Sequence, residues 1–517
     1  MRRLSHILRL IGIARTLARH DALFPLEPLP GGPSAARLLG LTVRRSNRNA
    51  ERRPGQRLAD ALQDLGPSFI KLGQALSVRA DLLGETMAND LGQLRDKLPP
   101  FPSDVAKRTI ESELGQPIAE LFVDFEDRPV AAASIAQVHR AVTQAADPEV
   151  ADTSEGRRAV AVKVLRPGIE TAFRRDIELF RWLAAIAEDR VPALRRLRPV
   201  EVVETLRDAV EIEMDLALEA AAASELKQNL AAVDHYRIPA VDWQRTGRRI
   251  LTQDWVDGIA IDDRDGLITA GHEPAALARQ VIEVFLAQAL RDGFFHADPH
   301  HGNLFVDEQG RLVAVDFGIM GRLDRPTRLF MAEMLAAFLA GDYRRAAEVH
   351  FEAGYVPADK SVAAFAQACR SIGEPILGKP VSEISIGTLL AQLFRITKTF
   401  DMQTQPQLLL LQKTMVTVEG VARGLDPEIN FWQAAEPVIA DWRRTDLGID
   451  AQLQELGRET AQLARRLPRL IGKLERMADN AAAIPNSTGD RQRDRRLSWP
   501  WTVAIAAAAV ALVLAVN

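Results

Sequence analysis

Two short stretches near the middle of the chain hold the residue types that phosphoryl transfer from ATP requires. The first, His296 to Phe305, places Asp298 and Asn303 at a D-x-x-x-x-N spacing. The second places Asp316 directly after the apolar run Leu312 to Val315, which predicts a short strand. In such a set one carboxylate orients or deprotonates the nucleophile, while the asparagine and the second aspartate hold Mg²⁺ against the phosphates. Either piece alone is common by chance, but together they favour this chemistry.

Phosphoryl transfer also needs a cation on the nucleotide phosphates, and Lys163 is the candidate. It lies within the predicted strand Val160 to Val164. A lysine in an apolar setting must find a negative partner or shift its pKa. A strand lysine that pairs with phosphates and with a helix glutamate has this environment in a kinase-like cleft. An edge-strand lysine that faces water is the alternative.

Acidic residues that could neutralise such a lysine gather on a predicted helix from about Val200 to Leu230. Glu211, Glu213 and Asp215 lie close together there. Glu219 follows four residues after Asp215, so we expect these two on one helical face. A solvated acidic face is the alternative.

A second lysine, Lys71, lies on a predicted helix that begins near Pro67. Gln74 projects from the neighbouring turn of the same helix. A lysine and a glutamine at this spacing are usually solvated, although Lys71 could also use one of the acids named above.

Composition limits the remaining possibilities. The 517 residues are too many for one core and predict about two to three folding units. A net charge of -4 argues against a general nucleic-acid binder. The single cysteine, Cys369, excludes a disulfide within the chain and a cysteine-based metal site, and it fits a reducing compartment.

Both ends of the chain have features of membrane contact. Met1 to His20 predicts a basic amphipathic helix, which either lies on an anionic membrane surface or is an ordinary surface helix. Trp501 to Val516 is apolar apart from Thr502 and follows an arginine-rich segment. Its length is near the lower limit of roughly 17 residues for a spanning helix, and its flanks favour a tail anchor with a cytoplasmic body. A buried or interfacial terminal helix is the alternative.

Taken in order, these motifs resemble those of protein kinases. They are strand residue Lys163, helix residue Glu219, a hinge at Gln253-Asp254-Trp255, the loop with Asp298 and Asn303, and Asp316-Phe317-Gly318. Three departures resemble one branch, the UbiB family of atypical kinase-like proteins of ubiquinone biosynthesis. They are the K-x-G-Q motif at Lys71 to Gln74, the E-x-D motif at Glu213 to Asp215, and an alanine-rich loop in place of a glycine-rich one, Ala131, Ala132, Ala133 and Ser134.

The resemblance covers roughly residues 60 to 440 and implies an α+β, bilobal protein-kinase-like fold with a helical N-terminal extension and a C-terminal membrane helix. We expect a basic N-terminal region and K-x-G-Q extension at 1–120, an N-lobe with a helical insert at 121–258 and a C-lobe at 259–440. A helical region and polar linker at 441–498 and a transmembrane segment at 499–517 complete the expected order.

The resemblance also implies roles for individual residues, with ATP and Mg²⁺ as cofactors. Asp298 would be the catalytic-loop acid, and Lys71 and Gln74 would lie over the active site, with Lys71 near Glu213 or Asp215. Asn303 and Asp316 would ligate Mg²⁺. The remaining implied residues would bind the nucleotide: Ala131, Ala132, Ala133, Ser134, Lys163, Glu213, Asp215, Glu219, Gln253 and Trp255.

The function implied is that of a membrane-anchored, Mg-dependent atypical kinase or ATPase that supports ubiquinone biosynthesis at the bacterial inner membrane. Membrane lipids, quinone precursors and other quinone-biosynthesis enzymes are the candidate partners. A non-catalytic nucleotide-binding scaffold and a protein kinase acting in trans are the alternatives, and a helix covering the cleft disfavours the latter. A quinone hydroxylase finds no support, because no G-x-G-x-x-G follows a strand and no Cys/His set suits iron or flavin.

Overall fold

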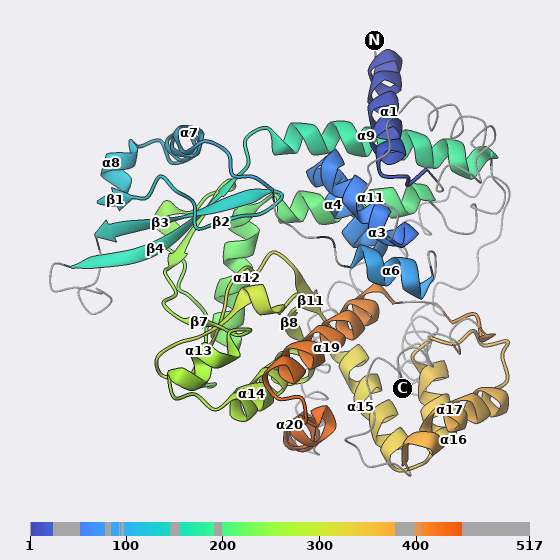
Figure 1. Ribbon diagram of the computed structural model, residues 1–517. Coiled ribbons are helices and arrows are strands. Elements are labelled where there is room, and N and C mark those ends of the chain that lie inside the picture. The colour runs from blue at the N-terminus through green and yellow to red at the C-terminus, as the bar shows by residue number, and fades with distance from the viewer. Residues whose placement is uncertain are drawn as a thin grey trace, which may run out of the picture. The chain divides into compact units, whose positions relative to one another are not determined.

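The computed structural model of the chain describes residues 2–23, 52–77, 84–92, 94, 98–144, 156–190, 199–377, 396, 399–402 and 405–446 (Figure 1). All of them belong to one compact unit, residues 1–447. The predicted linker and transmembrane segment fall in a second unit, 448–517, which lies outside the described residues. Within the described part, no helix is both long enough and apolar enough to span a bilayer.

A five-stranded sheet lies within the predicted N-lobe. Its strands are β1 (Asp124–Phe125), β2 (Ala131–Ala132), β3 (Ala136–Gln144), β4 (Arg157–Leu165) and β6 (Ile250–Asp254). In β4 the residues Val160, Val162 and Val164 are fully buried and pack with Ile110 of α7 (Ser103–Leu114), beside α8 (Ile118–Leu121). Because side chains alternate along a strand, this packing turns Lys163 to the other face of the sheet.

Two helices, and not the one predicted, carry the acidic residues. The chain is helical over α9 (Ile169–Arg190), α11 (Pro199–Glu213) and α12 (Leu216–Asn229). The prediction of one helix from 200 to 230 is wrong at Asp215, whose carboxylate accepts a hydrogen bond from the Ala217 amide at 3.1 Å and caps α12. Aspartate favours this position because its side chain satisfies an amide that a helix start leaves unpaired. Asp215 therefore caps the helix that carries Glu219, and its carbonyl accepts a hydrogen bond of 3.4 Å from the Glu219 amide one turn later.

The N-terminal extension consists of α1 (Arg2–Arg19), α3 (Pro54–Leu65), α4 (Pro67–Ser77) and α6 (Glu85–Leu91). α4 begins at Pro67 as predicted, and its Phe69 ring meets Phe180 of α9 edge-on at 5.0 Å. Arg9 of α1 binds the buried carboxylate of Asp176 through two hydrogen bonds of 3.0 and 3.2 Å. This part of α1 therefore packs as a helix of the folded unit, while contact of α1 with a membrane stays a prediction.

A second sheet, of four short strands, follows the order β5 (Tyr236–Arg237), β10 (Leu312–Ala314), β9 (Leu304–Val306) and β7 (Ile259–Ala260). The antiparallel pair β9 and β10 sets Leu304 opposite Ala314. A separate ribbon of β8 (Phe294–His296) and β11 (Met320–Arg322) sets His296 opposite Met320. These two registers bring the ends of four strands together where Asp298, Asn303 and Asp316 are found.

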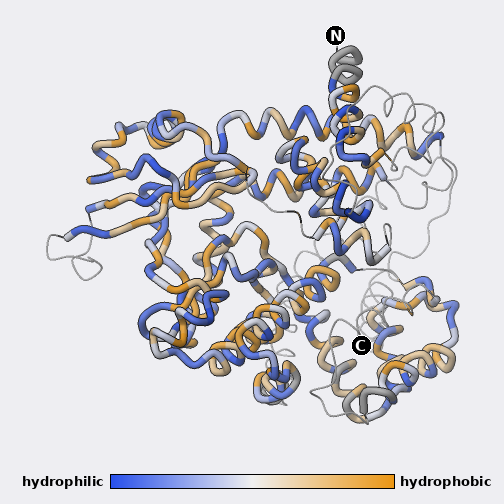
Figure 2. Tube along the Cα trace, in the orientation of Figure 1, coloured by the Kyte–Doolittle hydropathy of each residue, from blue (hydrophilic) through white to orange (hydrophobic). Residues whose placement is uncertain are grey.

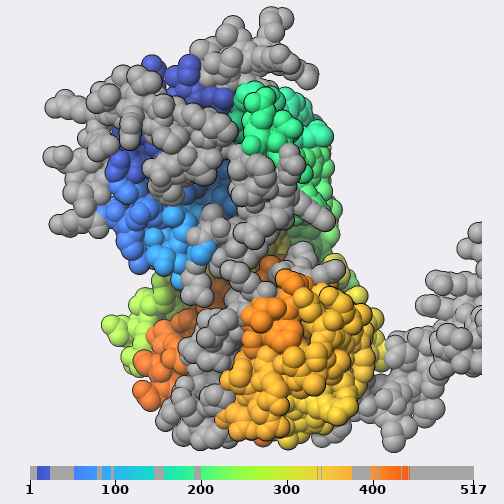
Figure 3. Space-filling model, turned by 90° about the vertical axis from the view of Figure 1, so that its right-hand side faces the viewer, coloured from blue at the N-terminus to red at the C-terminus, as the bar shows by residue number. Residues whose placement is uncertain are grey.

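Helices enclose these ribbons. α13 (Arg264–Thr269) precedes α14 (Pro274–Leu286), which continues as a π-helical turn, Ala287–Asp292. α14 packs against α19 (Pro406–Leu425) and α20 (Phe431–Asp446), and hydrophobic stretches of these helices are visible in Figure 2. α15 (Arg325–Leu339), α16 (Tyr343–Glu352) and α17 (Val362–Leu377) gather into one continuous surface in Figure 3, and their own apolar cluster includes Cys369.

Gly321 of β11 allows the closest approach in the ribbon that carries Asp298. A Cβ at this position would lie 2.1 Å from a ring atom of Phe295, which is fully buried and directly opposite in β8. We expect Gly321→Ala to destabilise the protein by about 1–3 kcal/mol, since the ring has no room to move. Gly420→Ala is the control, because its Cβ would meet nothing within 4 Å on the exposed side of α19. Equal midpoints of urea unfolding for the two variants would contradict this packing.

Candidate active site

Lys163 lies at the centre of the candidate site, where it bridges two carboxylates. Its Nζ atom is 2.8 Å and 3.0 Å from the two Glu219 oxygens and 3.1 Å from Oδ1 of Asp316. Glu219 also accepts a hydrogen bond of 3.2 Å from the Phe317 amide. A residue from β4, one from α12 and one that follows β10 are thus held together, as the predicted lysine and acids require.

The backbone at Asp316 adopts a conformation that few residues other than glycine tolerate. Its φ is +64°, and its Oδ1 accepts a hydrogen bond of 3.3 Å from the Gly318 amide. Aspartate visits this left-handed region more readily than most side chains, because it can bond to its own local backbone. The cost of such a conformation is about 1–3 kcal/mol, and it persists only where neighbouring contacts hold it. Here it directs the carboxylate toward Lys163.

The shared lysine shifts the three pKa values in different directions. Burial, reinforced by the nearby Asp316 charge, raises the pKa of Glu219 to about 7 despite the attraction of Lys163. Burial alone would raise the pKa of Asp316, but the Lys163 ammonium holds it below its usual value. Burial alone would lower the pKa of Lys163, but the two carboxylates raise it. One cation between two anions leaves an excess negative charge, which is suited to a further cation.

Hydrogen bonds between buried polar groups hold the backbone of the loop with Asp298. The Asp298 amide donates to Nδ1 of His296 at 3.1 Å, and the His296 amide donates to Oε1 of Gln288 at 2.9 Å. Gln288 comes from the π-helical turn and lines a small cavity together with Tyr236 of β5. Burial lowers the pKa of His296, so its ring is neutral and its Nδ1 can accept a hydrogen bond. His296 is therefore a structural support of this loop.

Asn303 is fixed beside this loop and beside Asp316. Its side-chain amide donates to the backbone carbonyl of Asp298 at 3.3 Å, and its own backbone carbonyl accepts from the Val315 amide at 2.9 Å. The Oδ1 atom of Asn303 and the half-exposed carboxylate of Asp316 are hard oxygen ligands of the kind that Mg²⁺ prefers. Among the described residues, no cluster of three His, Cys, Asp or Glu side chains could hold a metal. Two protein ligands plus phosphate oxygens are a usual Mg²⁺ environment, so these residues fit the ion.

The alanine-rich loop makes a tight turn between β2 and β3, with the Ala133 amide donating to the Ala136 carbonyl at 2.8 Å. Arg166 holds this turn by donating to the Ser134 carbonyl at 3.3 Å and to the Ala133 carbonyl at 3.4 Å. The Ser134 side chain is fully buried, and its hydroxyl has no partner among the described residues. These contacts therefore fix the conformation of the turn.

The predicted hinge residues lie at the end of β6. Gln253 pairs with Ala161 of β4, and the Trp255 amide donates to the Ala159 carbonyl at 3.1 Å. The Trp255 ring nitrogen donates to Asp257 at 2.8 Å, so the ring is tied to the start of the connection toward β7. Gln253 and Trp255 thus lie along the same pair of strands as Lys163.

One residue of the K-x-G-Q motif forms an ion pair with one residue of the E-x-D motif. Lys71 of α4 is buried and forms an ion pair with Glu213 at the end of α11. Asp215 instead caps α12 and lies 3.9 Å from Arg248. Gln74 lies one turn after Lys71, and its carbonyl accepts from the Ser77 hydroxyl at 2.7 Å. Of the two acids predicted as partners of Lys71, the structure selects Glu213.

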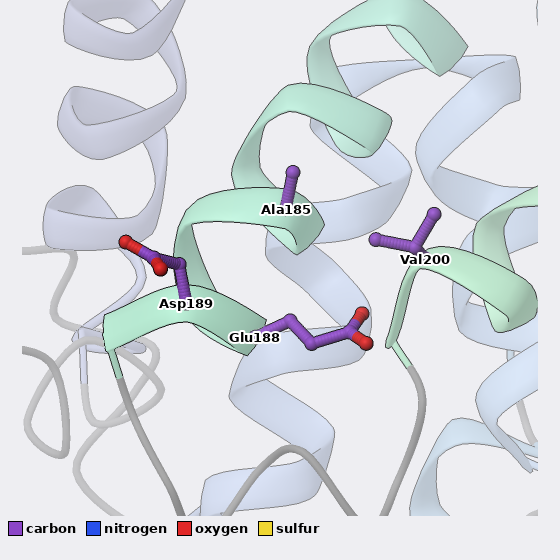
Figure 4. A pocket seen from close by; sticks show the side chains of 4 residues that line it. All are labelled: Ala185, Glu188, Asp189 and Val200. Carbon is purple, nitrogen blue, oxygen red and sulfur yellow. The ribbon is translucent and has the colours of Figure 1, made fainter.

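A separate surface hollow lies between the end of α9 and the start of α11. Its described lining is Ala185, Glu188, Asp189 and Val200 (Figure 4). None of these residues belongs to the phosphoryl-transfer set, and we assign the hollow no role.

Comparison with known proteins agrees with this geometry. Residues 93–350 match the model of the ABC1 atypical kinase-like domain, and residues 369–430 match the UbiB helical domain. A relative from Marinobacter nauticus, named Probable protein kinase UbiB, is 40% identical over 459 residues, which are 88% of this chain and 82% of that protein. The chain belongs to the UbiB family. A Pseudomonas aeruginosa protein of the same name is 38% identical over 483 residues, 92% of this chain and 89% of its own.

The UbiB family assignment confirms the resemblance drawn from the motifs, and a kinase-like domain implies the use of ATP. The solved structure of the Rv3197–erythromycin complex from Mycobacterium tuberculosis matches with a TM-score of 0.50 and 22% identity. The match covers 79% of this chain and 98% of that one. At this identity it supports the mixed helix and sheet fold alone.

Several residues of this UbiB-family site were missed by sequence reasoning. Arg166 and Thr414 hold loops through contacts with residues 32 and 117 positions away, and Gln288 reaches the His296 amide from the end of α14. Lys413 lies 3.6 Å from Asp298, although 115 positions separate them in the chain. Local spacing carries no signal of this kind, because a fold is needed to bring such residues together.

The ion pair of Lys71 and Glu213 can be tested by its contribution to the free energy of unfolding. Both side chains are largely buried, so we expect Glu213→Gln to lower the free energy of unfolding by about 2–3 kcal/mol, somewhat less than the loss of one partner from a fully buried pair. The double variant with Lys71→Met should recover about 1–2 kcal/mol, as contacting residues couple. Urea denaturation measures both. Glu374→Gln, in the exposed pair with Arg370, is the control. Strictly additive losses would contradict a direct ion pair.

The raised pKa of Glu219 predicts a pH dependence of stability. An ordinary glutamate titrates near 4.5, whereas Glu219 in the folded protein has a pKa of about 7. Between these values the folded protein binds more protons than the unfolded chain, so its stability falls as pH rises. Glu219→Gln removes this contribution. We therefore expect the wild type to lose stability relative to Glu219→Gln from about pH 5 to about pH 7, measured by urea unfolding. A difference independent of pH in this window would contradict the assignment.

Proposed function

We propose that this UbiB-family protein is an Mg-dependent ATPase or atypical kinase that supports ubiquinone biosynthesis. The observation that carries the proposal is the contact of Lys163 with both Glu219 and Asp316, because this triad is the nucleotide-binding arrangement of kinase-like clefts. The UbiB name of the curated relatives supports the link to ubiquinone.

Each residue of the site would have a defined task. Asp316 and Asn303 would hold Mg²⁺, which when bound neutralises charge on the phosphates. Lys163, released in part from Asp316, would contact the nucleotide phosphates and keep its bond to Glu219. Asp298 would orient the attacking hydroxyl or water, since it is held at the loop apex by His296 and Asn303. Ala131 to Ser134 would cover the phosphates, and Gln253 and Trp255 would line the base side.

The buried pair of Lys71 and Glu213 supports a role for the K-x-G-Q helix as a cover of the site. A helix tied to α11 in this way would limit access by large protein substrates and would favour a small acceptor or water. Gln74 would lie on the same cover, and Asp215 would fix the start of the helix that carries Glu219.

We also propose that the protein acts at the bacterial inner membrane with its catalytic body in the cytoplasm. The support is the apolar segment Trp501 to Val516 and the basic residues before it. Membrane lipids, quinone precursors and other enzymes of the pathway are the proposed partners.

ATP turnover by the purified full chain with liposomes tests the proposal. We expect Asp316→Asn and Asp298→Asn each to lower turnover by about 100-fold or more, because each removes a charge that acts on the reacting groups. Omission of Mg²⁺ should have a similar effect in the wild type.

Asp104→Asn serves as the matched control, since this aspartate is exposed on α7 and pairs only with Arg108 among the described ion pairs. If Asp316→Asn binds ATP and retains wild-type turnover, the catalytic proposal fails. If the wild type binds Mg·ATP without turnover, a nucleotide-binding scaffold is the better description.

A further inference from the structure

The catalytic loop of this protein lacks a cation of its own between its two functional residues. The segment after Asp298 reads Pro299, His300, His301 and Gly302 before Asn303, with no lysine or arginine. Phosphoryl transfer builds up charge on the oxygens of the transferred group, and positive side chains that face this charge stabilise the transition state. Lys163 is already shared by two carboxylates. A second cation is therefore needed from elsewhere in the fold.

Lys413 of α19 is placed to supply it. Its Nζ atom lies 3.6 Å from Oδ1 of Asp298, whereas His300 lies 3.6 Å from the other carboxylate oxygen, Oδ2. Among the described residues, Lys413 is the one lysine or arginine that pairs with Asp298. The Lys413 side chain is 40% exposed, so its ammonium group is on the open side of the loop and can turn toward a ligand.

The helix that carries Lys413 is fastened to the same loop by the next residue. Thr414 is fully buried, and its hydroxyl lies 3.0 Å from the carbonyl oxygen of Ala297 and 2.8 Å from that of Leu410 in its own helix, so the two acceptors share its one proton. Ala297 directly precedes Asp298, so this contact fixes the backbone of α19 beside the residue that carries the catalytic carboxylate. The hydrophobic residues Leu411 and Val418 on the buried side of α19 hold the helix against the core. The position of Lys413 is thus set by rigid packing.

We propose that Lys413 is a further catalytic residue, which contacts the terminal phosphate of bound ATP and stabilises the charge that develops as this group is transferred. The inference rests on the proposed function and adds a residue to its site. It also means that the active site is completed by α19, which lies in the UbiB helical domain and outside the kinase-like domain. In the structure the ammonium group lies beside the Asp298 carboxylate.

The test compares Lys413→Met with Lys413→Arg in the full chain. If Lys413 contacts the terminal phosphate, the methionine variant should lose about 100-fold in ATP turnover, and the arginine variant should recover at least about tenfold of that loss. The ratio of ATP to ADP affinity, measured by calorimetry with Mg²⁺, should fall by about tenfold in Lys413→Met, with ADP affinity unchanged. A structural role of Lys413 would lower both affinities and would not be rescued by arginine.

Arg423→Met is the matched control, because Arg423 lies on the same helix and pairs with Glu419 at 3.1 Å, away from the loop. Wild-type turnover, or an unchanged ratio of ATP to ADP affinity, in Lys413→Met would overturn the inference. A wild type that shows no turnover would count against the proposed function, while the affinity ratio would still decide the role of Lys413.

Discussion

One lysine shared by two carboxylates is the interaction on which the rest of the site depends. Lys163 comes from the first sheet, Glu219 from α12, and Asp316 from the segment after the second sheet. Charges withdrawn from water are costly unless they are paired, so this bridge links β4, whose valines lie in one apolar cluster, to the segment after β10, which packs in another. Its excess negative charge and its partial exposure at Asp316 also explain why a metal-bound nucleotide suits this location.

Hydrogen bonds between neutral, buried groups support the loop next to this bridge. His296 and Gln288 form a chain of hydrogen bonds that supports the loop with Asp298. Because each member is largely buried and hydrogen-bonded, the chain fixes the loop without placing another charge near Asp298. The carboxylates of Asp298 and Asp316 remain partly exposed, where a ligand can reach them.

Much of the site was predictable because its residues lie in motifs with a local physical signature. A strand lysine, an acid after an apolar run and a D-x-x-x-x-N loop each follow from spacing, and the structure brings these side chains together. The break before α12 was missed, since Asp215 was counted as a helix residue when its short acidic side chain is better suited to a cap. The roles of Lys413 and Arg166 depend on tertiary contacts with the loops, which periodicity does not encode.

The π-helical turn at the end of α14 has a consequence for how the sequence can vary. Such a turn accommodates one residue more than a regular helix would, and here it brings Gln288 into contact with the His296 amide. A deletion just before Gln288 would move its side chain into the position of Ala287, about 100° around the helix axis. Gln288 would then point away from the catalytic loop. The length of this segment is therefore constrained as strictly as the identity of the residues that it supports.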